Sequence, residues 1–248
     1  MLTQPVIDTL KKADPDRCRA AMFGEAATRG KLLTLYAFHY ELAKVPELVS
    51  EPMLGAIRYQ WWRDCVDEIY TDKPVRRHVV ATPLAEVLRA SDVPRFWIDR
   101  LIDGRERDID PRPFADMDAA RAYCQATSGQ LMQIALKLTG EAGETLLGRA
   151  WGLTGLARGY RFYHDAMLKN LSYAEICQAA REDYDSARSA EPKISSAAMP
   201  AAAYAALIPP FLQRLDGREG TEDTPLVFGA FAKQTKLLRT AMTGRLPR

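Results

Sequence analysis

The sequence predicts an all-α protein, and three observations support that prediction. Apolar residues recur at helical spacing along most of the 248 residues. Strand signals are nearly absent, with no Asn-Gly turn and no sustained alternation of β-branched residues. Helix start and stop residues also stand where the periodicity needs them: Asp116 and Gly140 bound one segment, and Ser172 with Glu175 forms a capping box before another.

Each predicted element is a stretch of helical periodicity that ends at a polar or proline-containing loop. The loops "TDKPVRRHVV", "DIDPRPFAD" and "RSAEPKISSA" are the longest of these interruptions, and none is long enough to separate two domains. We therefore expect a single domain over residues 1–248. In chain order, the predicted helices cover residues 31–48, 53–71, 82–90, 94–103, 116–139, 143–164, 172–188, 198–214 and 225–243.

Composition narrows the possible functions. Hydrophobic residues make up 47% of the chain, enough for a substantial core, and the net charge of +2 argues against a nucleic-acid partner. The cysteines form no CxxC pair, which favours buried, reduced thiols and a cytoplasmic protein over a disulfide or zinc framework. The N-terminus lacks a secretory h-region. The four cysteines are Cys18, Cys65, Cys124 and Cys177.

The C-terminal third contains the most apolar stretch, "ISSAAMPAAAYAALIPPFL", which prolines interrupt and which is too short to span a bilayer. Its large apolar residues recur at helical spacing, so they either close the core or form a contact surface for a membrane or a protein. Nearby cations would favour an anionic surface. The apolar residues are Tyr204, Leu207, Ile208, Phe211 and Leu212, and the cations are Arg214, Arg218, Lys233, Lys236 and Arg239.

Acidic side chains offer one candidate metal site. Asp64 and Glu68 stand at i, i+4 with Asp67 beside them, a spacing that suits either two metal ligands or a solvated helix face. Asp103 and Asp108 stand among arginines and are expected to pair locally. The three histidines have no metal-binding spacing. His39 lies in an apolar helical segment and is expected in the core or lining a pocket.

Four glycines form a stripe along one predicted helix. Gly148, Gly152, Gly155 and Gly159 share a narrow helix face, and each costs about 1 kcal/mol relative to alanine. Such a stripe indicates either close packing of another helix or a smooth wall of a cavity. Bulky side chains of the 31–48 segment are expected to lean towards it.

Several segments, taken together, resemble the squalene/phytoene synthase family. They are "LYAFHYELAKVPELVSEPMLGAIRYQWWRDCVDEIY", "RFWIDRLIDGRERDID", "YCQATSGQLM" and "GRAWGLTGLARGYR". The resemblance is strongest over residues 14–188. It implies an all-α isoprenoid synthase fold around a central cavity, with the 31–48 and 143–164 helices facing each other. Active members bind Mg²⁺ through two aspartate-rich motifs and condense two prenyl diphosphates.

At the positions of those motifs this sequence differs from active members. The first keeps one acid and places a lysine where Mg²⁺ would approach, so Lys44 is expected to pair with Glu41 and Glu47 instead. The second keeps only an arginine. The resemblance also implies a cavity lining of Tyr36, His39, Tyr123 and Gln130. The first-motif positions are Tyr40, Ala43, Lys44 and Glu47, and the second-motif positions are Gly152, Gly155, Arg158, Gly159 and Tyr163.

The segment "AFHYELAKVPELVSE" is most similar to the non-catalytic branch of the family that includes a mitochondrial complex I assembly factor. That similarity implies a pseudoenzyme without metal or cofactor, with respiratory-complex subunits or assembly factors as partners and a peripheral position at the inner membrane. Two alternatives remain open. One is a prenyltransferase that binds Mg²⁺ through altered ligands such as Asp64, Glu68 or Asp108. The other is a protein that binds a prenyl lipid or quinone without chemistry.

Overall fold

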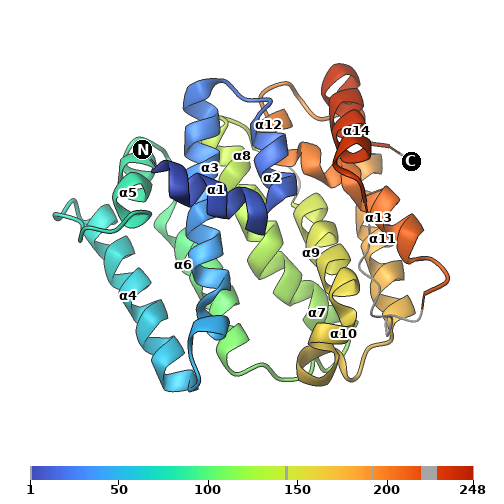
Figure 1. Cartoon of the computed structure of the whole chain (residues 1–248), viewed down its shortest axis with the longest axis horizontal. Helices are drawn as coiled ribbons and strands as arrows, with labels where there is room; N and C mark the ends of the chain where they lie inside the picture. The colour runs from blue at the N-terminus through green and yellow to red at the C-terminus, as the bar shows by residue number, and fades with distance from the viewer. Residues whose placement is uncertain (1, 143–144, 191–192, 219–227, 248) are drawn as a thin grey trace.

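The structure of the protein is a computed structural model that describes residues 2–142, 145–190, 193–218 and 228–247. Within these residues every regular element is helical, apart from a single bridge between Lys193 and Arg245 (Figure 1). The all-α prediction is therefore confirmed. No helix in the described ranges is long and apolar enough to cross a membrane.

The helices follow one another with short connections. The α-helices are α1 (Gln4–Ala13), α2 (Pro15–Ala21), α3 (Ala26–Ala43), α4 (Pro52–Tyr70), α5 (Ala81–Arg89), α6 (Arg95–Glu106), α7 (Met117–Cys124), α8 (Gln130–Leu138), α9 (Leu146–Arg158), α10 (Tyr160–Tyr163), α11 (Tyr173–Ala190), α12 (Met199–Ala202), α13 (Ile208–Leu215) and α14 (Ala230–Thr243). The 3₁₀ turns are Val45–Leu48, Arg107–Ile109 and Ala203–Leu207, and the π-helical turns are Gln125–Gly129 and His164–Leu168.

The two N-terminal helices are absent from the predicted set. Only Asp14 separates α1 from α2, and its carboxylate accepts a hydrogen bond from Arg17 N. Pro15 stands at the first position of α2, where the missing N–H costs nothing because that group has no helical partner. A proline that looks like a break in the sequence therefore begins a helix.

Four of the predicted helices are interrupted. Pro46 stops α3 at Ala43, because the residue before a proline disfavours helical geometry, and the chain continues as a 3₁₀ turn. The predicted 116–139 helix contains a π-helical turn, the 143–164 helix breaks at Gly159, and the 198–214 segment divides into α12, a 3₁₀ turn and α13. Predicted residues 143, 144 and 225–227 lie outside the described ranges.

Predicted cap residues act as expected. The Asp116 carboxylate accepts a hydrogen bond from Ala119 N at 2.8 Å, and Gly140 follows α8 with a φ of 83°. Ser172 N donates to Glu175 Oε2 at 2.8 Å, while Glu175 N donates to Ser172 Oγ at 3.3 Å. Local hydrogen bonding thus fixes where these helices begin and end.

The other helices pack around a rod formed by α7, the π-helical turn Gln125–Gly129 and α8. In Figure 1, α3 to α6 lie on one side of this rod, and α9 to α13 lie on the other. The predicted arrangement of the 31–48 and 143–164 helices on opposite sides of the centre agrees with this view.

Two charge-assisted bonds join α9 to α11: Arg149 Nε and Nη2 lie 2.6 and 2.7 Å from the Asp183 carboxylate.

The apolar stretch of the C-terminal third is buried in the core. Phe211 and Leu212 are 1% and 3% exposed, and Tyr204, Leu207 and Ile208 are fully buried. The hypothesis that this stripe forms a contact surface is therefore wrong, because its 3₁₀ turn and α13 pack against α2, α9 and α14. The four cysteines are free and buried, as expected.

Candidate functional site

The residues at the first-motif positions lie at the end of α3 and in the 3₁₀ turn that follows. Lys44 Nζ is 2.6 Å from Glu41 Oε1 and 5.5 Å from the centroid of the Tyr40 ring. The expected pairing of Lys44 with Glu41 is therefore confirmed. Glu47 is exposed, and Ala43 contributes no polar group.

Lys44 and Glu41 line a surface groove of about 300 Å³ between the end of α3 and α4. Trp61, Trp62 and His78 form its aromatic wall, with the rings packed edge to face. The lysine at the first-motif position thus lines an outer groove. The ion pair with Glu41 and the Tyr40 ring hold its ammonium group there.

The glycine stripe on α9 has two explanations, one for each end. A Cβ on Gly148 would lie 2.8 Å from the Gly129 Cα and the Ser128 carbonyl, and one on Gly152 would lie 2.9 Å from the Cys124 Cβ. These glycines let α9 approach the π-helical turn and the end of α7 closely. A Cβ added to Gly155 would meet no atom within 4 Å, so the stripe faces open space there.

The expectation that side chains from α3 lean against the stripe is therefore wrong at Gly155. Further along the second-motif positions, Gly159 lies against the Tyr163 ring, which would be 2.8 Å from an added Cβ. Arg158 turns away and places its guanidinium 4.2 Å from the centroid of the Phe211 ring. No second-motif position presents a carboxylate.

A half-buried polar cluster joins α3, α6 and α7, and we call it the Arg105 cluster: His39, which is buried, with Arg105, Asp108 and Tyr123. Arg105 Nη2 lies 2.9 Å from His39 Nε2, and Nη1 donates to Asp108 Oδ2 at 3.1 Å. Tyr123 Oη donates to Asp108 Oδ1 at 2.8 Å and lies 3.2 Å from Arg105 Nη1. The Tyr59 hydroxyl lies 2.9 Å from the Arg105 carbonyl oxygen.

The electrostatics of the Arg105 cluster fix its protonation states. Burial lowers the pKa of His39 well below its usual value, and the nearby guanidinium of Arg105 lowers it further. His39 is therefore neutral, with Nε2 free to accept from Arg105. Burial raises the pKa of Tyr163; Arg105 opposes this change, while Asp108 and Glu47 add to it. Tyr163 thus lies beside the cluster and within electrostatic range of Glu47.

The residues at the two motif positions do not fit a Mg²⁺–diphosphate site. Hard divalent cations need several oxygen ligands around one point. Glu47 is the one acid at these positions, and both oxygens of nearby Asp108 are engaged by Arg105 and Tyr123. Across the described part of the chain, no group of three or more His, Cys, Asp or Glu side chains is placed to hold a metal ion.

The alternative ligands on α4 lie on its outer surface and are engaged in ion pairs. Glu68 receives a bidentate contact from Arg76, with Nη2 at 2.6 Å, and Asp64 lies 3.7 Å from the same guanidinium. Asp67 pairs with Arg95 at 3.0 Å. These ion pairs engage the carboxylates that the altered-ligand alternative would need at this helix. Asp103 also pairs outside its own segment, with Arg63 at 2.6 Å.

A buried arginine lies deeper in the molecule, in what we call the Arg17 cluster: Asp14, Arg17, Tyr36, Ser128 and Tyr204. Arg17 Nη1 is 2.7 Å from Asp14 Oδ2, and Nη2 donates to Ser128 Oγ at 3.4 Å. Its guanidinium carbon lies 5.0 Å from the centroid of the Tyr204 ring. The Tyr204 hydroxyl attracts Arg17 electrostatically, but the geometry falls short of a hydrogen bond.

Several polar atoms in this region have no hydrogen-bond partner among the described residues. They are Arg17 Nε, Tyr36 Oη, Tyr204 Oη and Gln130 Nε2. Each carries a hydrogen, so together they form a buried set of donors. Of the expected cavity lining, Tyr36 belongs to this region, Gln130 begins α8 two residues after Ser128, and His39 and Tyr123 belong to the Arg105 cluster.

Sequence reasoning missed both arginines and Tyr204 as site residues. One local signal was available for Arg17: Asp14 stands three residues before it, directly ahead of a proline, a pattern that begins a helix and pairs the two side chains. For Arg105, the spacing to Asp108 predicted a local pair, which is confirmed, but nothing in the sequence indicated His39 as its partner.

The two ends of the glycine stripe are expected to respond oppositely to an added methyl group. Gly148→Ala forces Cβ against backbone atoms and should lower the free energy of unfolding by about 1–3 kcal/mol. Gly155→Ala meets open space and should raise it by up to about 1 kcal/mol through helix propensity. Urea unfolding of the two variants and the parent protein measures both changes. A loss of stability in Gly155→Ala would contradict the open space assigned to that position.

Stability should fall at mildly acidic pH because of His39. The unfolded chain binds a proton on this histidine near pH 6.5, whereas the folded protein does so only at lower pH. Stability is therefore lost as pH falls below about 6.5, by up to about 1.4 kcal/mol per pH unit. His39→Gln keeps an acceptor for Arg105 and removes this proton.

The measurement is urea unfolding of the parent and His39→Gln at pH 7.5 and pH 5.5. The parent is expected to lose about 1 kcal/mol more than the variant between these values. His78, whose pKa is also lowered by burial, is present in both proteins and cancels. Equal losses would mean that His39 binds a proton in the folded state.

Comparison with known proteins gives relatives of two kinds. Curated relatives include the proteins named NADH dehydrogenase (ubiquinone) complex I, assembly factor 6, from Bos taurus and Homo sapiens, each 26% identical over 187 residues. The match covers 72% of this chain and 56% of each relative. A homolog from Dictyostelium discoideum is 23% identical and is covered over 48% of its length. The chain thus spans about half the length of the curated relatives it matches.

Among solved structures, the crystal structure of a dehydrosqualene synthase in complex with ligand aligns with a TM-score of 0.77 at 14% identity. The alignment covers 96% of this chain and 94% of that one, which confirms the isoprenoid synthase fold. The sequence model of the squalene/phytoene synthase family matches residues 10–171, well over half of the chain and most of the segment where the resemblance was recognised. By sequence and by fold, this chain belongs to the squalene/phytoene synthase family.

Proposed function

We propose that this protein is a non-catalytic member of its family that acts as an assembly factor for respiratory complex I. The relatives at 26% identity carry that function in their names, and they match over 72% of this chain. The partners under this proposal are complex I subunits or other assembly factors. The protein works in the cytoplasm, peripherally at the inner membrane where such a complex is built.

The observation that carries the non-catalytic half of the proposal is the chemistry at the two motif positions. Departure of a diphosphate needs Mg²⁺ or an equivalent positive centre, and Mg²⁺ needs clustered oxygen ligands. Here Ala43, Gly152, Gly155 and Gly159 supply no ligand at all. The half-buried carboxylate of Asp108 already neutralises Arg105. We therefore assign the protein no cofactor and no prenyl transfer.

A surface around the former first motif supports the interaction half of the proposal. Large apolar side chains are exposed at the groove beside Lys44 and next to it: Ile57 is 60% exposed and Leu48 is 52% exposed. Together with Trp61, they give the groove an apolar floor and rim over the tryptophan-rich helix. Aromatic and apolar side chains of this kind are enriched at protein–protein contacts. We assign this groove to a protein partner.

The proposal is tested by deleting the gene in its native host and resolving the respiratory complexes on native gels. Full-size complex I should be lost or greatly reduced, with smaller subassemblies in its place, while succinate dehydrogenase is unchanged. A plasmid copy of the parent gene should restore the complex. Unchanged complex I in the deletion strain would contradict the proposal.

Two variants sharpen this test. Ile57→Asp puts a charge into the groove and should fail to restore complex I, because burying an unpaired carboxylate at a contact is costly. Phe96→Asp is the matched control: Phe96 is 56% exposed on α6, outside the groove, and this variant should restore the complex.

The purified protein, incubated with labelled farnesyl or geranylgeranyl diphosphate, Mg²⁺ and NADPH, should give no squalene or phytoene. Product above a no-enzyme control would favour the prenyltransferase alternative.

A second candidate function is ligand binding without chemistry, and one observation favours it. The unpartnered donors in and near the Arg17 cluster belong to side chains at most 5% exposed. Buried donors are normally paired with protein, ordered water or a ligand. Two of the four atoms are N–H donors and two are hydroxyls that can also donate, so the set suits an acceptor, such as the carbonyl oxygen of a quinone or the oxygen-rich head of a prenyl lipid.

Native mass spectrometry of the purified protein separates this candidate from a purely structural centre. A bound molecule should appear as a discrete mass difference and should be lost in the Tyr36→Phe plus Tyr204→Phe double variant, which removes two of the donors. Each tyrosine keeps its ring, so the packing is retained. If the measured mass of the parent protein is that of its chain alone, no ligand is bound and water is the partner of these groups.

A further inference from the structure

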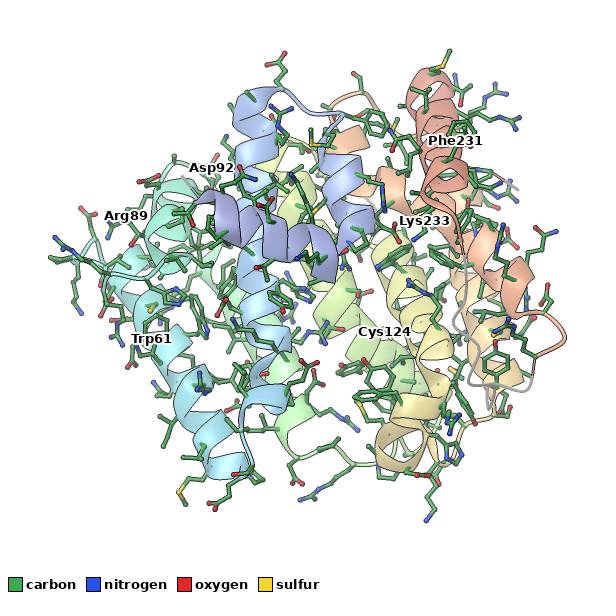
Figure 2. The ribbon with its side chains drawn as sticks, in the orientation of Figure 1. Trp61, Arg89, Asp92, Cys124, Phe231 and Lys233 are labelled. Carbon is green, nitrogen blue, oxygen red and sulfur yellow. The ribbon has the colours of Figure 1, made fainter. Side chains whose placement is uncertain are left out.

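The outward face of α14 carries large apolar side chains. Phe231 is 84% exposed, Met242 is 80% exposed and Leu238 is 48% exposed. Figure 2 shows Phe231 on the outer side of this helix and Lys233 directed from the same helix into the body of the molecule. A helix at the surface of a globular protein normally presents polar residues to solvent. Here three of its largest apolar residues point away from the core.

The three residues form one narrow stripe. They stand seven and four positions apart, so at about 100° per residue they fall within about 40° of one another around the helix. The buried residues of α14, Lys233, Leu237 and Thr240, lie on the opposite side. The stripe is therefore the outermost line of the helix, and it extends over about 16 Å from Phe231 to Met242.

A buried ion pair prevents α14 from turning this stripe inward. Lys233 Nζ lies 2.9 Å from each oxygen of Asp16 on α2, and the ammonium group is 4.9 Å from the centroid of the Phe211 ring. Rotation of the helix would expose Leu237, which is fully buried, and would leave the Asp16 carboxylate without this partner. The expectation that Lys233 meets a surface outside the molecule is accordingly wrong.

The charges on α14 itself and in the described residues that flank it have one sign. Residues 228–247 contain no aspartate or glutamate, and the exposed cations Lys236, Arg239 and Arg245 lie on or directly after the helix. Arg239 stands between Leu238 and the buried face, on the flank of the stripe. Apolar side chains at the apex with cations on the flank are the pattern of a helix that lies in a membrane interface.

The spacing favours lipid over a protein groove. A helix that docks into a protein groove offers apolar anchors at i, i+3 or i+4, and i+7, so that neighbouring anchors fill one continuous cleft. In α14 the intermediate positions are Gln234 and Thr235, which are polar and exposed. Separate apolar side chains can still enter a lipid interface one by one, since lipid adapts to each of them.

We propose that the outer face of α14 docks on an anionic lipid bilayer, with Phe231, Leu238 and Met242 inserted at the headgroup boundary. Arg239, on the flank of the stripe, then meets the headgroup charges, which attract cations close to the surface. This surface lies on a different helix from the groove assigned to a protein partner. The proposal does not depend on complex I assembly, and it is tested on the purified chain alone.

The test is flotation with vesicles of phosphatidylcholine, with or without phosphatidylglycerol. The parent protein should float with the anionic vesicles and stay behind with the neutral ones. Phe231→Ser plus Met242→Ser should lower the bound fraction by at least about tenfold, because apolar insertion supplies much of the binding. Arg239→Gln, or added salt, should also weaken binding because charge attraction is removed or screened.

The matched control is Phe162→Ser plus Met53→Ser, which removes two side chains that are 78% and 72% exposed on α10 and α4. This variant should float like the parent protein. All variants alter exposed positions, and thermal unfolding confirms that they are folded. Three results would overturn the proposal: a parent protein that does not float, equal loss in the control, or undiminished binding in the α14 apolar variant. If the parent protein does not float but self-associates, and Phe231→Ser abolishes the self-association, the outer face of α14 is a protein contact instead.

Discussion

A half-buried guanidinium group where α3, α6 and α7 meet is the interaction on which the centre of this protein depends. Arg105 is bound to Asp108, to the neutral His39 and to the Tyr123 hydroxyl, and its own carbonyl oxygen lies next to the Tyr59 hydroxyl of α4. A buried charge is tolerated only when it is paired and hydrogen-bonded, and removal of one partner is more costly than the pair is stabilising. The cluster therefore fixes the positions of four helices at once.

The same cluster bears on the proposal that this synthase fold acts without the synthase chemistry. In an enzyme of this family the centre must hold carboxylates free to bind Mg²⁺. Here the half-buried carboxylate of Asp108 is neutralised by a permanent cation, and Tyr163 rather than an acid lies beside it. Deeper in, Arg17 is neutralised by Asp14 in the same way. Both arginines keep the interior polar, and the fold is retained because the apolar contacts between the helices do not need the metal.

Close backbone contacts fix the position of α9, and one further ion pair fixes the position of α14. Gly148 and Gly152 bring α9 against the π-helical turn, whose Ser128 contacts Arg17. The Lys233–Asp16 pair fixes α14 on α2 and thereby decides which of its faces meets solvent. The groove beside Trp61 and the stripe on α14 are thus two separate apolar surfaces, held on helices whose opposite faces are locked into the core. The first suits a protein partner and the second an anionic lipid surface.

The sequence alone determined the all-α class, most helix positions and the family, because these follow from periodicity, cap residues and ordered motifs. Asp116, Gly140 and the Ser172–Glu175 box act through neighbours in the chain, so their effects were predictable. Only the tertiary structure decided the Arg105–His39 contact, the unpartnered donors near Arg17 and the burial of the Tyr204–Leu212 stripe. It also decided that Lys233 is buried while Phe231 is exposed. These outcomes depend on which helix packs against each face, and that is set by contacts between residues up to 217 positions apart in the chain.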